Sequence, residues 1–364
     1  MRRSLAKMDH TSLTSKFESF LEGMLAGAAP GELITAPGLY AMPEAAYHAD
    51  PVFEPSLSRS IAEKLILQSP MHAFSAHPRL TKQEEKDEAN SRARDIGSAA
   101  HAMLLGQPTV ISVLMFDDFK KKAAQEARTE AQEKGAIALL KKDMETVQAM
   151  VEKARAVLAE NEDDAVRALA GSGDEAWPRF NEVTAVWQDR CGGIWSRARM
   201  DRLSISAKTI TIIDYKTTEL SAAPDYVART IFNNNYHFQE AFYRRGLRQL
   251  FPEIDRHERR LDFRFIVQEQ EPPFEITVAK VDAAGRLIGE KMASAAFLLW
   301  RKCLTENHWP GYPGETKTAE MPPYIDTRWC AKEIEDPYLQ GLGFDPMPFF
   351  ETNPYKPKPI MEPN

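Results

Sequence analysis

The stretch TITIIDYKTT, residues 209–218, constrains this chain most, because it ends an apolar strand with an acid and an amine. Side chains alternate across a β-strand, so Ile210, Ile212, Asp214 and Lys216 point to one face. Such a strand is predicted to run from a hydrophobic core into a polar site. An Asp-x-Lys pair also occurs at ordinary solvated strand ends, so the pair needs partners before it indicates chemistry.

The strand predicted before it, residues 193–205, supplies such a partner. By alternation four of its residues share one face: Arg197, Arg199, Asp201 and Leu203. A tight connection at residues 206–209 would pair Leu203 with Ile212. The same register sets Asp201 directly opposite Asp214, with Cβ atoms roughly 5 Å apart.

Two carboxylates at that separation repel each other unless a positive charge lies between them. A hard divalent cation, Mg²⁺ or Mn²⁺, prefers oxygen ligands of this kind. Lys216 lies on the same face, where its amine can orient or deprotonate a water. This combination suits hydrolysis of a phosphodiester, and Arg197 and Arg199 would then hold neighbouring phosphates.

Four further polar residues are candidates for the same site. Gln239 and Tyr243 stand four apart on a predicted helix and so share a face, although a solvated helix rim has the same pattern. His101 lies among Ala and Leu, where it is either a satisfied core residue or a metal ligand. Glu182, on the first predicted strand, is either an accessory carboxylate or an ordinary edge residue.

The charge balance limits the class of partner. The chain has 364 residues and a formal net charge of −7, which argues against a protein that coats DNA through overall positive charge. Carboxylates that hold a metal add negative charge locally, so a nucleic-acid enzyme fits this balance. Its phosphate contacts are then expected from a local basic patch.

The cysteines and the hydropathy pattern narrow the cellular setting. Cys191, Cys303 and Cys330 form no CxxC pair and no Cys/His cluster at zinc spacing. We therefore expect neither a disulfide framework nor an iron–sulfur cluster, and a cytoplasmic location. The sequence has no run of eighteen apolar residues that would predict a membrane span, and Glu22 interrupts the N-terminal apolar patch, which argues against a secretory signal.

The order of the patterns predicts an α/β fold with a mixed central sheet flanked by helices. Ser58 or Ser60 is expected to cap an early helix, and residues 225–251 have continuous helical spacing. We divide the chain into four parts: a lead segment (1–50), a core (51–310), a Lys/Glu-rich helical insertion within it (about 117–170) and a tail (311–364). Eleven of the 24 prolines lie in residues 310–364, so we expect this tail to be extended.

The motifs together resemble the PD-(D/E)XK nuclease superfamily, whose core is restriction-endonuclease-like. They occur in this order: GSAAH (97–101), NEVTAVW (181–187), RARMD (197–201), IIDYKTT (212–218) and YHFQEAFYRRG (236–246). More narrowly, the chain is similar to the exonuclease VIII (RecE-like) branch of phages and prophages, over roughly residues 39–310.

The resemblance implies a role for each candidate. The metal ligands would be His101, Asp201, Asp214 and the backbone carbonyl of Tyr215. Lys216 would be the catalytic lysine, Gln239 and Tyr243 would belong to the Gln-xxx-Tyr helix of the family, and Glu182 would be an accessory acid.

The resemblance also implies an activity. Relatives are Mg²⁺-dependent exonucleases that degrade linear double-stranded DNA from the 5′ end as ring-shaped oligomers and pass the 3′ strand to an annealing partner. Two alternatives stay open: a structure-specific or restriction-like endonuclease with the same site, and a non-catalytic DNA-binding or annealing protein on this scaffold.

Overall fold

The computed structural model describes residues 32–81, 92–172, 178–190 and 192–340, so the N-terminal segment, Cys191 and the last part of the tail lie outside the described residues. The chain divides into two compact units, Met1–Gly311 and Tyr312–Asn364. Each unit is described by itself.

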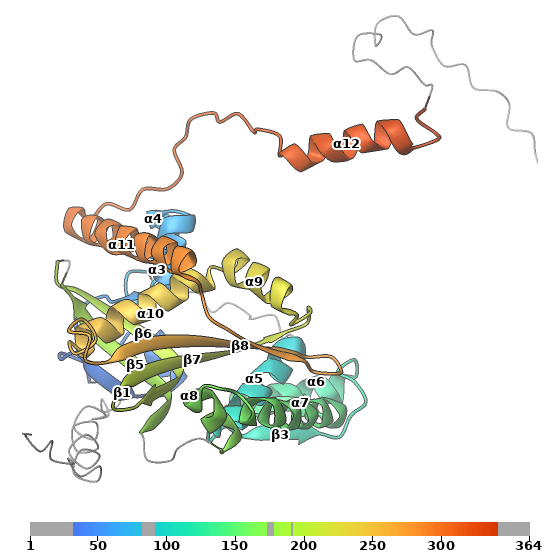
Figure 1. Ribbon diagram of the computed structural model, residues 1–364, viewed down its shortest axis with the longest axis horizontal. Coiled ribbons are helices and arrows are strands. Elements are labelled where there is room, and N and C mark those ends of the chain that lie inside the picture. The colour runs from blue at the N-terminus through green and yellow to red at the C-terminus, as the bar shows by residue number, and fades with distance from the viewer. Residues whose placement is uncertain (1–31, 82–91, 173–177, 191, 341–364) are drawn as a thin grey trace, which may run out of the picture. The chain divides into compact units, whose positions relative to one another are not determined.

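The larger unit is built on a mixed sheet that has seven strands within the described residues (Figure 1). The strands are β1 (Gly38–Ala41), β2 (Leu57–Ser58), β5 (Arg179–Asp189), β6 (Ile194–Ile205), β7 (Thr209–Thr218), β8 (Arg260–Glu269) and β9 (Ile276–Ala279). Their order is β1-β5-β6-β7-β8-β9, with β2 beside β6. Only β7–β8 and β2–β6 are parallel among these pairs. The predicted α/β fold with a mixed central sheet is confirmed.

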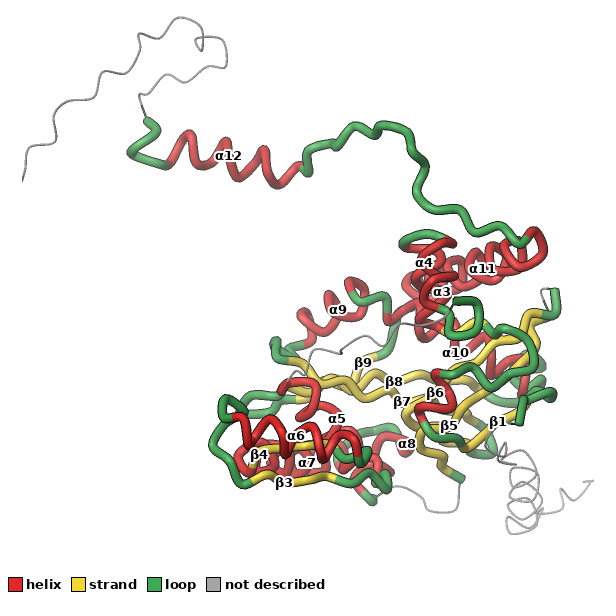
Figure 2. The backbone as a smooth tube through the Cα atoms, turned by 180° about the vertical axis from the view of Figure 1, so that it is seen from behind, coloured by secondary structure: helices red, strands yellow, loops and turns green. Residues whose placement is uncertain are grey.

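Helices cover both faces of this sheet (Figures 1 and 2). One face carries α3 (Arg59–Leu67), α4 (Pro70–Ala76), α9 (Pro224–Asn233), α10 (Tyr236–Leu250) and α11 (Ala283–Glu306). The other face carries α5 (Arg92–Leu105), α7 (Lys141–Ala159), α8 (Asp164–Arg167) and the 3₁₀ turn Ala168–Ala170. Strand β7 is apolar on both sides for this reason: Ile212 belongs to the first core and Ile213 to the second.

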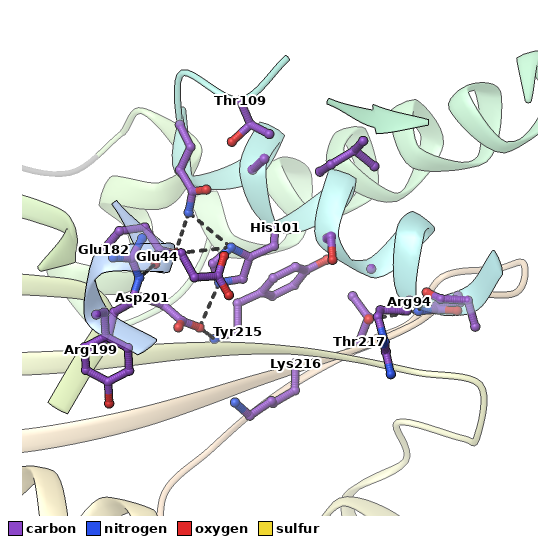
Figure 3. A pocket seen from close by; sticks show the side chains of 18 of the residues that line it. Glu44, Arg94, His101, Thr109, Glu182, Arg199, Asp201, Tyr215, Lys216 and Thr217 are labelled. Carbon is purple, nitrogen blue, oxygen red and sulfur yellow. Dashed lines mark hydrogen bonds and ion pairs between the residues drawn. The ribbon is translucent and has the colours of Figure 1, made fainter. Parts of the chain in front are cut away.

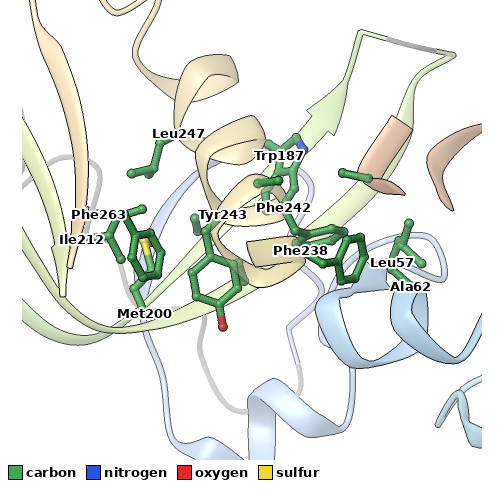
Figure 4. Close-up of a cluster of buried hydrophobic side chains, with 14 of the residues drawn as sticks. Leu57, Ala62, Trp187, Met200, Ile212, Phe238, Phe242, Tyr243, Leu247 and Phe263 are labelled. Atoms are coloured by element: carbon green, nitrogen blue, oxygen red, sulfur yellow. The ribbon is translucent and has the colours of Figure 1, made fainter. Parts of the chain in front are cut away.

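The first core contains the largest apolar side chains. Trp187 of β5 packs edge-on against Phe242 of α10, whose ring stacks on Phe297 of α11 (Figure 4). Gly246 lets α10 approach β5, because a Cβ at that position would lie 2.8 Å from the Trp187 ring. This packing fixes α10 against the sheet and thereby the position of the polar residues at its N-terminal end.

Two predicted helical regions differ from the structure. The region 225–251 is divided between α9 and α10, because Asn235 adopts a left-handed backbone conformation (φ 55°) that Asn tolerates better than most residues. The insertion contains helices α6 (Lys122–Glu133) and α7, but also β4 (Ile137–Leu140), which forms a separate parallel pair with β3 (Ile111–Leu114) just before the insertion. A four-residue apolar strand amid Lys, Glu and Ala is too short to show the hydrophobic periodicity of a helix or a strand. Its conformation is therefore decided by the distant strand with which it pairs.

The lead segment contributes ordered elements near its end. Strand β1 pairs antiparallel with β5, and helix α2 (Glu44–His48) follows it. Ser58, one of the two expected caps, accepts a hydrogen bond from the Ile61 N–H at the start of α3.

A buried ion pair ties this segment to β6. Asp50 is 2% exposed, and its Oδ1 lies 2.8 Å from Arg197 Nη1. Ser56 donates to the same carboxylate through its backbone N–H and its hydroxyl, and His77 Nε2 lies 3.3 Å from Oδ2. Burial alone would raise the pKa of Asp50, but His77, Arg197 and Ser56 outweigh it and lower the pKa below its usual value.

This pairing corrects the expectation for Arg197. Its guanidinium is 2% exposed and also donates to the carbonyls of Tyr47 and Ser56. Arg197 is therefore not in a position to contact a phosphate at the surface, because its charge is already matched inside the protein.

The second unit contains α12 (Pro323–Glu335), which has no buried side chain. The described part of the Pro-rich tail is thus helical over these residues, although an extended chain was expected. Across the described ranges, none of the helices combines the length and apolar character needed to cross a membrane.

The Asp50–Arg197 pair generates a stability prediction. Asp50→Asn leaves Arg197 buried without its anion, so the free energy of unfolding should fall by about 3–5 kcal/mol at pH 7. Urea denaturation followed by circular dichroism measures it. Glu130→Gln, which removes the acid of an exposed pair with Lys134, is the control and should change little. Equal stability of Asp50→Asn and wild type would contradict the assignment.

The sign of the pH dependence follows from the lowered pKa of Asp50. Its contribution is fully present above the unfolded-state pKa of about 4 and is lost as the pH falls through the lower folded-state value. The stability difference between wild type and Asp50→Asn should therefore stay constant from pH 7 to about pH 5 and shrink below about pH 4.

Candidate active site

The candidate site begins where β6 loses its backbone pairing. The predicted register is present, with Ile205 opposite Ile210 and Leu203 opposite Ile212. The β6–β7 ladder ends with Arg202 opposite Ile213, one pair before Asp201 would face Asp214.

On the other side of β6, the ladder with β5 omits the pair between Glu182 and Asp201, and Glu182 has a left-handed backbone conformation (φ 53°). This irregularity corrects the expected alternation along β6. Met200 and Leu203 belong to the same core although they are three residues apart, so Leu203 does not share a face with Arg197 and Arg199.

Beyond the end of the β6–β7 ladder, the Asp201 carboxylate accepts the Tyr215 N–H in place of a backbone carbonyl of β6. Its Oδ2 accepts a hydrogen bond from the backbone N–H of Tyr215 (2.9 Å) and lies 2.9 Å from His101 Nε2 (Figure 3). Asp201 thus connects β6, β7 and α5 at one point.

The second acid lies on the opposite side of β7, so the prediction that Asp201 and Asp214 face each other on one side of the sheet is wrong. Asp214 is 1% exposed, and Gln239 of α10 donates to its Oδ1 at 2.5 Å. Lys216 Nζ lies 2.7 Å from Asp214 Oδ2 and 5.2 Å from the centroid of the Tyr236 ring. Tyr243, one turn beyond Gln239 on α10, is buried, and the charges of Asp214 and Asp201 act on its hydroxyl.

The electrostatics of these groups are interdependent. Burial raises the pKa of Asp214, and the charge of Asp201 adds to this effect, so that the attraction of Lys216 is outweighed. Burial would also raise the pKa of Asp201, but His101 and then Lys216 lower it below its usual value. Burial disfavours the charged amine of Lys216, yet Asp214 and Asp201 together raise its pKa.

Helix α5 places His101 above this group, and a glycine permits its approach. A Cβ at Gly97 would lie 2.5 Å from Thr217 Oγ1 on β7, so a larger residue would push the helix outward. His101 follows one turn later, with its ring 6.0 Å from that of Tyr215. Burial disfavours a charged imidazole, but Asp201 and Glu182 outweigh it and raise the pKa of His101.

A second layer of polar residues surrounds His101. Glu182 Oε1 lies 3.5 Å from His101 Nδ1 and accepts a 2.5 Å hydrogen bond from Gln107 Nε2, while Arg199 Nε donates to Glu182 Oε2 at 2.5 Å. Arg199 also donates to the carbonyl of Met42. Arg199, which was expected to contact a phosphate, is therefore already bonded to Glu182.

These residues line an open cleft of about 810 Å³. Asp201, Lys216, Tyr215 and His101 contribute to its wall, whereas Asp214 is buried behind it. Arg94, Arg199 and His48, whose side chains carry nitrogen groups, also line the cleft.

The donor set fits a hard divalent cation. His101, Glu182 and Asp201 each offer a ligand atom within 4.8 Å of the others. The 2.9 Å between His101 Nε2 and Asp201 Oδ2 is close to the ~3 Å edge between neighbouring ligands of an octahedral Mg²⁺ with bonds of ~2.1 Å.

Six of the candidates from the sequence line this cleft, and they come from four elements, α5, β5, β6 and β7: His101, Glu182, Arg199, Asp201, Tyr215 and Lys216. Asp214, Gln239 and Tyr243 lie behind it, and Arg197 is buried against Asp50. Sequence reasoning missed Gln107 and Glu44, which also line the cleft. Neither stands in a motif, although Gln107 directly follows the Gly106 that ends α5.

A comparison with protein families decides the relationship. Residues 62–321 match the model of the PDDEXK-like domain of unknown function (DUF3799). The chain belongs to this PDDEXK-like family. The acid, acid-x-Lys arrangement of Asp201, Asp214 and Lys216 is consistent with that membership, while the narrower exonuclease VIII branch is not part of the match.

Two solved structures are similar to this PDDEXK-like protein. A candidate exonuclease from Eubacterium rectale is 13% identical with a TM-score of 0.42, over 75% of this chain and 93% of that one. The protein SSO0001 is 11% identical with a TM-score of 0.21, over 58% of this chain and 88% of that one. No curated protein matches the chain.

The short distance between His101 and Asp201 leads to a prediction about metal binding. Titration of the full-length protein with Mn²⁺ in a calorimeter should show saturable binding that Asp201→Asn abolishes or weakens at least about tenfold, because it removes a ligand oxygen and its charge. Glu258→Gln, an exposed acid paired with Arg256, is the control and should bind like wild type. Unchanged affinity of Asp201→Asn would show that the ion lies elsewhere.

Proposed function

We propose that this protein is a Mg²⁺-dependent exodeoxyribonuclease, with Mn²⁺ able to substitute. It hydrolyses linear double-stranded DNA in the 5′→3′ direction and leaves 3′ single-stranded tails for recombination. The position of Asp201, His101 and Lys216 at one open cleft, with Asp214 buried behind it and paired with Lys216, carries this proposal. Its polarity, a ring-shaped homo-oligomer and an annealing protein as partner rest on the resemblance of the sequence alone.

The metal would be held by Asp201, Asp214, His101 Nε2 and the backbone carbonyl of Tyr215. A divalent cation bound there supplies positive charge that polarises the scissile phosphate and stabilises the leaving oxygen. The raised pKa of the buried Asp214 carboxyl supports this assignment, since a carboxylate next to a second acid gains from a cation nearby.

Lys216 acts as a hydrogen-bond donor rather than as a base. Its pKa is raised by the two acids, so the amine is protonated at neutral pH. As an ammonium group it orients the attacking water and the phosphate, and it balances charge that develops on oxygen. Of the two roles open from the sequence, orientation and deprotonation, the electrostatics favour the first.

The helix α10 residues support this lysine. Gln239 holds Asp214 through its 2.5 Å hydrogen bond, so that the other carboxylate oxygen faces Lys216. Burial, with nearby Tyr47, Asp214 and Asp201, raises the pKa of Tyr243 well above its usual value, which keeps its hydroxyl protonated. A protonated hydroxyl is a donor for a water or phosphate oxygen.

A digestion assay tests the reaction and its direction. Linear duplex DNA labelled at the 5′ or the 3′ end is incubated with and without Mg²⁺. The 5′ label should be released first as short products, only with the metal, and closed circular DNA of the same sequence should stay intact. Cutting of the circle would identify an endonuclease, and binding without cutting a non-catalytic protein.

A lysine substitution tests the catalytic assignment. Lys216→Ala removes the oriented donor, so the rate of DNA degradation should fall at least about 100-fold while the thermal unfolding profile is kept. Lys208→Ala, in the exposed turn at the other end of β7, is the matched control. Degradation by Lys216→Ala at the wild-type rate would contradict the proposed role of Lys216 in the mechanism.

A further inference from the structure

The two ring nitrogens of His101 face different acids. Nε2 lies 2.9 Å from Asp201 Oδ2, while Nδ1 lies 3.5 Å from Glu182 Oε1 and 3.2 Å from Gln107 Nε2. The two nitrogen lone pairs of an imidazole diverge, so one ion can be bound through one of them only. An ion that His101 shares with Asp201 therefore uses Nε2, and Glu182 lies behind the ring on the other side.

Glu182 is held in this place from both sides. Arg199 Nε donates to Oε2 and Gln107 Nε2 donates to Oε1, each at 2.5 Å. Arg199 is fixed in turn by the carbonyl of Met42 at 2.8 Å. The left-handed backbone of Glu182, at the interruption of the β5–β6 ladder, directs its side chain out of the regular alternation.

Gln107 reaches the same point because of how α5 ends. Gly106 has a positive φ of 65°, and the Gln107 N–H bonds back to the Ala102 carbonyl at 2.9 Å. This left-handed end turns the chain back along the helix. The amide of Gln107 consequently lies beside a histidine six positions earlier.

We propose that Glu182 and Gln107 are positioning residues that hold His101 with Nε2 directed at Asp201 and the metal. In the tautomer with the proton on Nδ1, Glu182 Oε1 at 3.5 Å is the acceptor that faces this N–H, and the Gln107 amide donates to Glu182 rather than to the ring, which clamps the carboxylate in place. The assignment rests on the proposed metal-dependent function. It separates Glu182 from the ligands themselves, although its carboxylate lies within the same 4.8 Å cluster.

The physical reason is general to histidine ligands. A ring that donates its second N–H to a fixed carboxylate keeps one tautomer and one orientation, and it becomes a stronger ligand. Without the clamp, the ring of His101 is free to rotate and must be ordered when the ion binds. Loss of such a partner weakens metal affinity by about 10–100-fold.

Calorimetric titration of the full-length protein with Mn²⁺ tests the proposal. Glu182→Ala and Gln107→Ala should each weaken the affinity about 10–100-fold. Glu182→Gln retains an amide oxygen that accepts from Nδ1–H, so it should recover most of the loss. Gln188→Ala, an exposed glutamine elsewhere on β5, should bind as wild type does.

Two outcomes would overturn it. Wild-type affinity in Gln107→Ala and Glu182→Ala would remove the positioning role. A loss in Glu182→Gln as large as that in Asp201→Asn would make Glu182 a direct ligand instead. Thermal unfolding of each variant establishes that a folded protein is being titrated.

Nuclease assays at increasing Mg²⁺ separate this proposal from the proposed function. If the positioning role is correct, excess metal restores the rate of Gln107→Ala toward wild type but leaves Lys216→Ala inactive. A wild-type protein that neither binds the metal nor cuts DNA would refute the function itself. A wild type that does both, with variants indistinguishable from it, would refute the positioning role alone.

Discussion

The site depends on one interruption of backbone pairing, at Asp201 in β6. A regular ladder would occupy the groups that flank this residue, and its side chain would stand perpendicular to the sheet. The β6–β7 ladder ends before Asp201 and the β5–β6 ladder omits its pair, and Asp201 instead accepts the Tyr215 N–H and contacts His101. The gap thereby joins an acid of one strand to the backbone of its neighbour, and the cleft opens at the same place.

Two of the buried acids of this protein, Asp50 and Asp214, illustrate opposite uses of charge. Asp50 is matched by Arg197 and several hydrogen bonds, and its pKa is lowered. Asp214 is paired with Lys216 beside a second acid, and its pKa is raised. The first arrangement satisfies the charge and stabilises the fold. The arrangement at Asp214 leaves an excess of negative charge next to a cleft, which favours the binding of a cation and chemistry on a phosphate group.

Helices from the two faces of the sheet complete the site. Helix α5 brings His101 to one side of β7, where Gly97 permits its close approach. Helix α10 brings Gln239 to the other side, and its packing on Trp187 fixes that position. Strand β7 is thus held between two independent cores, so the polar residues at its end are anchored by apolar packing on either side.

The sequence by itself determined the strand with Asp214 and Lys216, its register with the preceding strand, and the α/β class, because alternation and a short turn leave few other pairings. Helical spacing and local context added His101, Gln239, Tyr243 and Glu182 as candidates, and the motif resemblance gave each of them a role. Only the tertiary structure decided that Arg197 is buried against Asp50, that the alternation breaks at Glu182 and that Gln107 reaches His101. Each of these depends on a distant segment or on a left-handed backbone, and local periodicity contains neither. The small strands β3 and β4 were missed for the same reason, since each exists only through its pairing with the other.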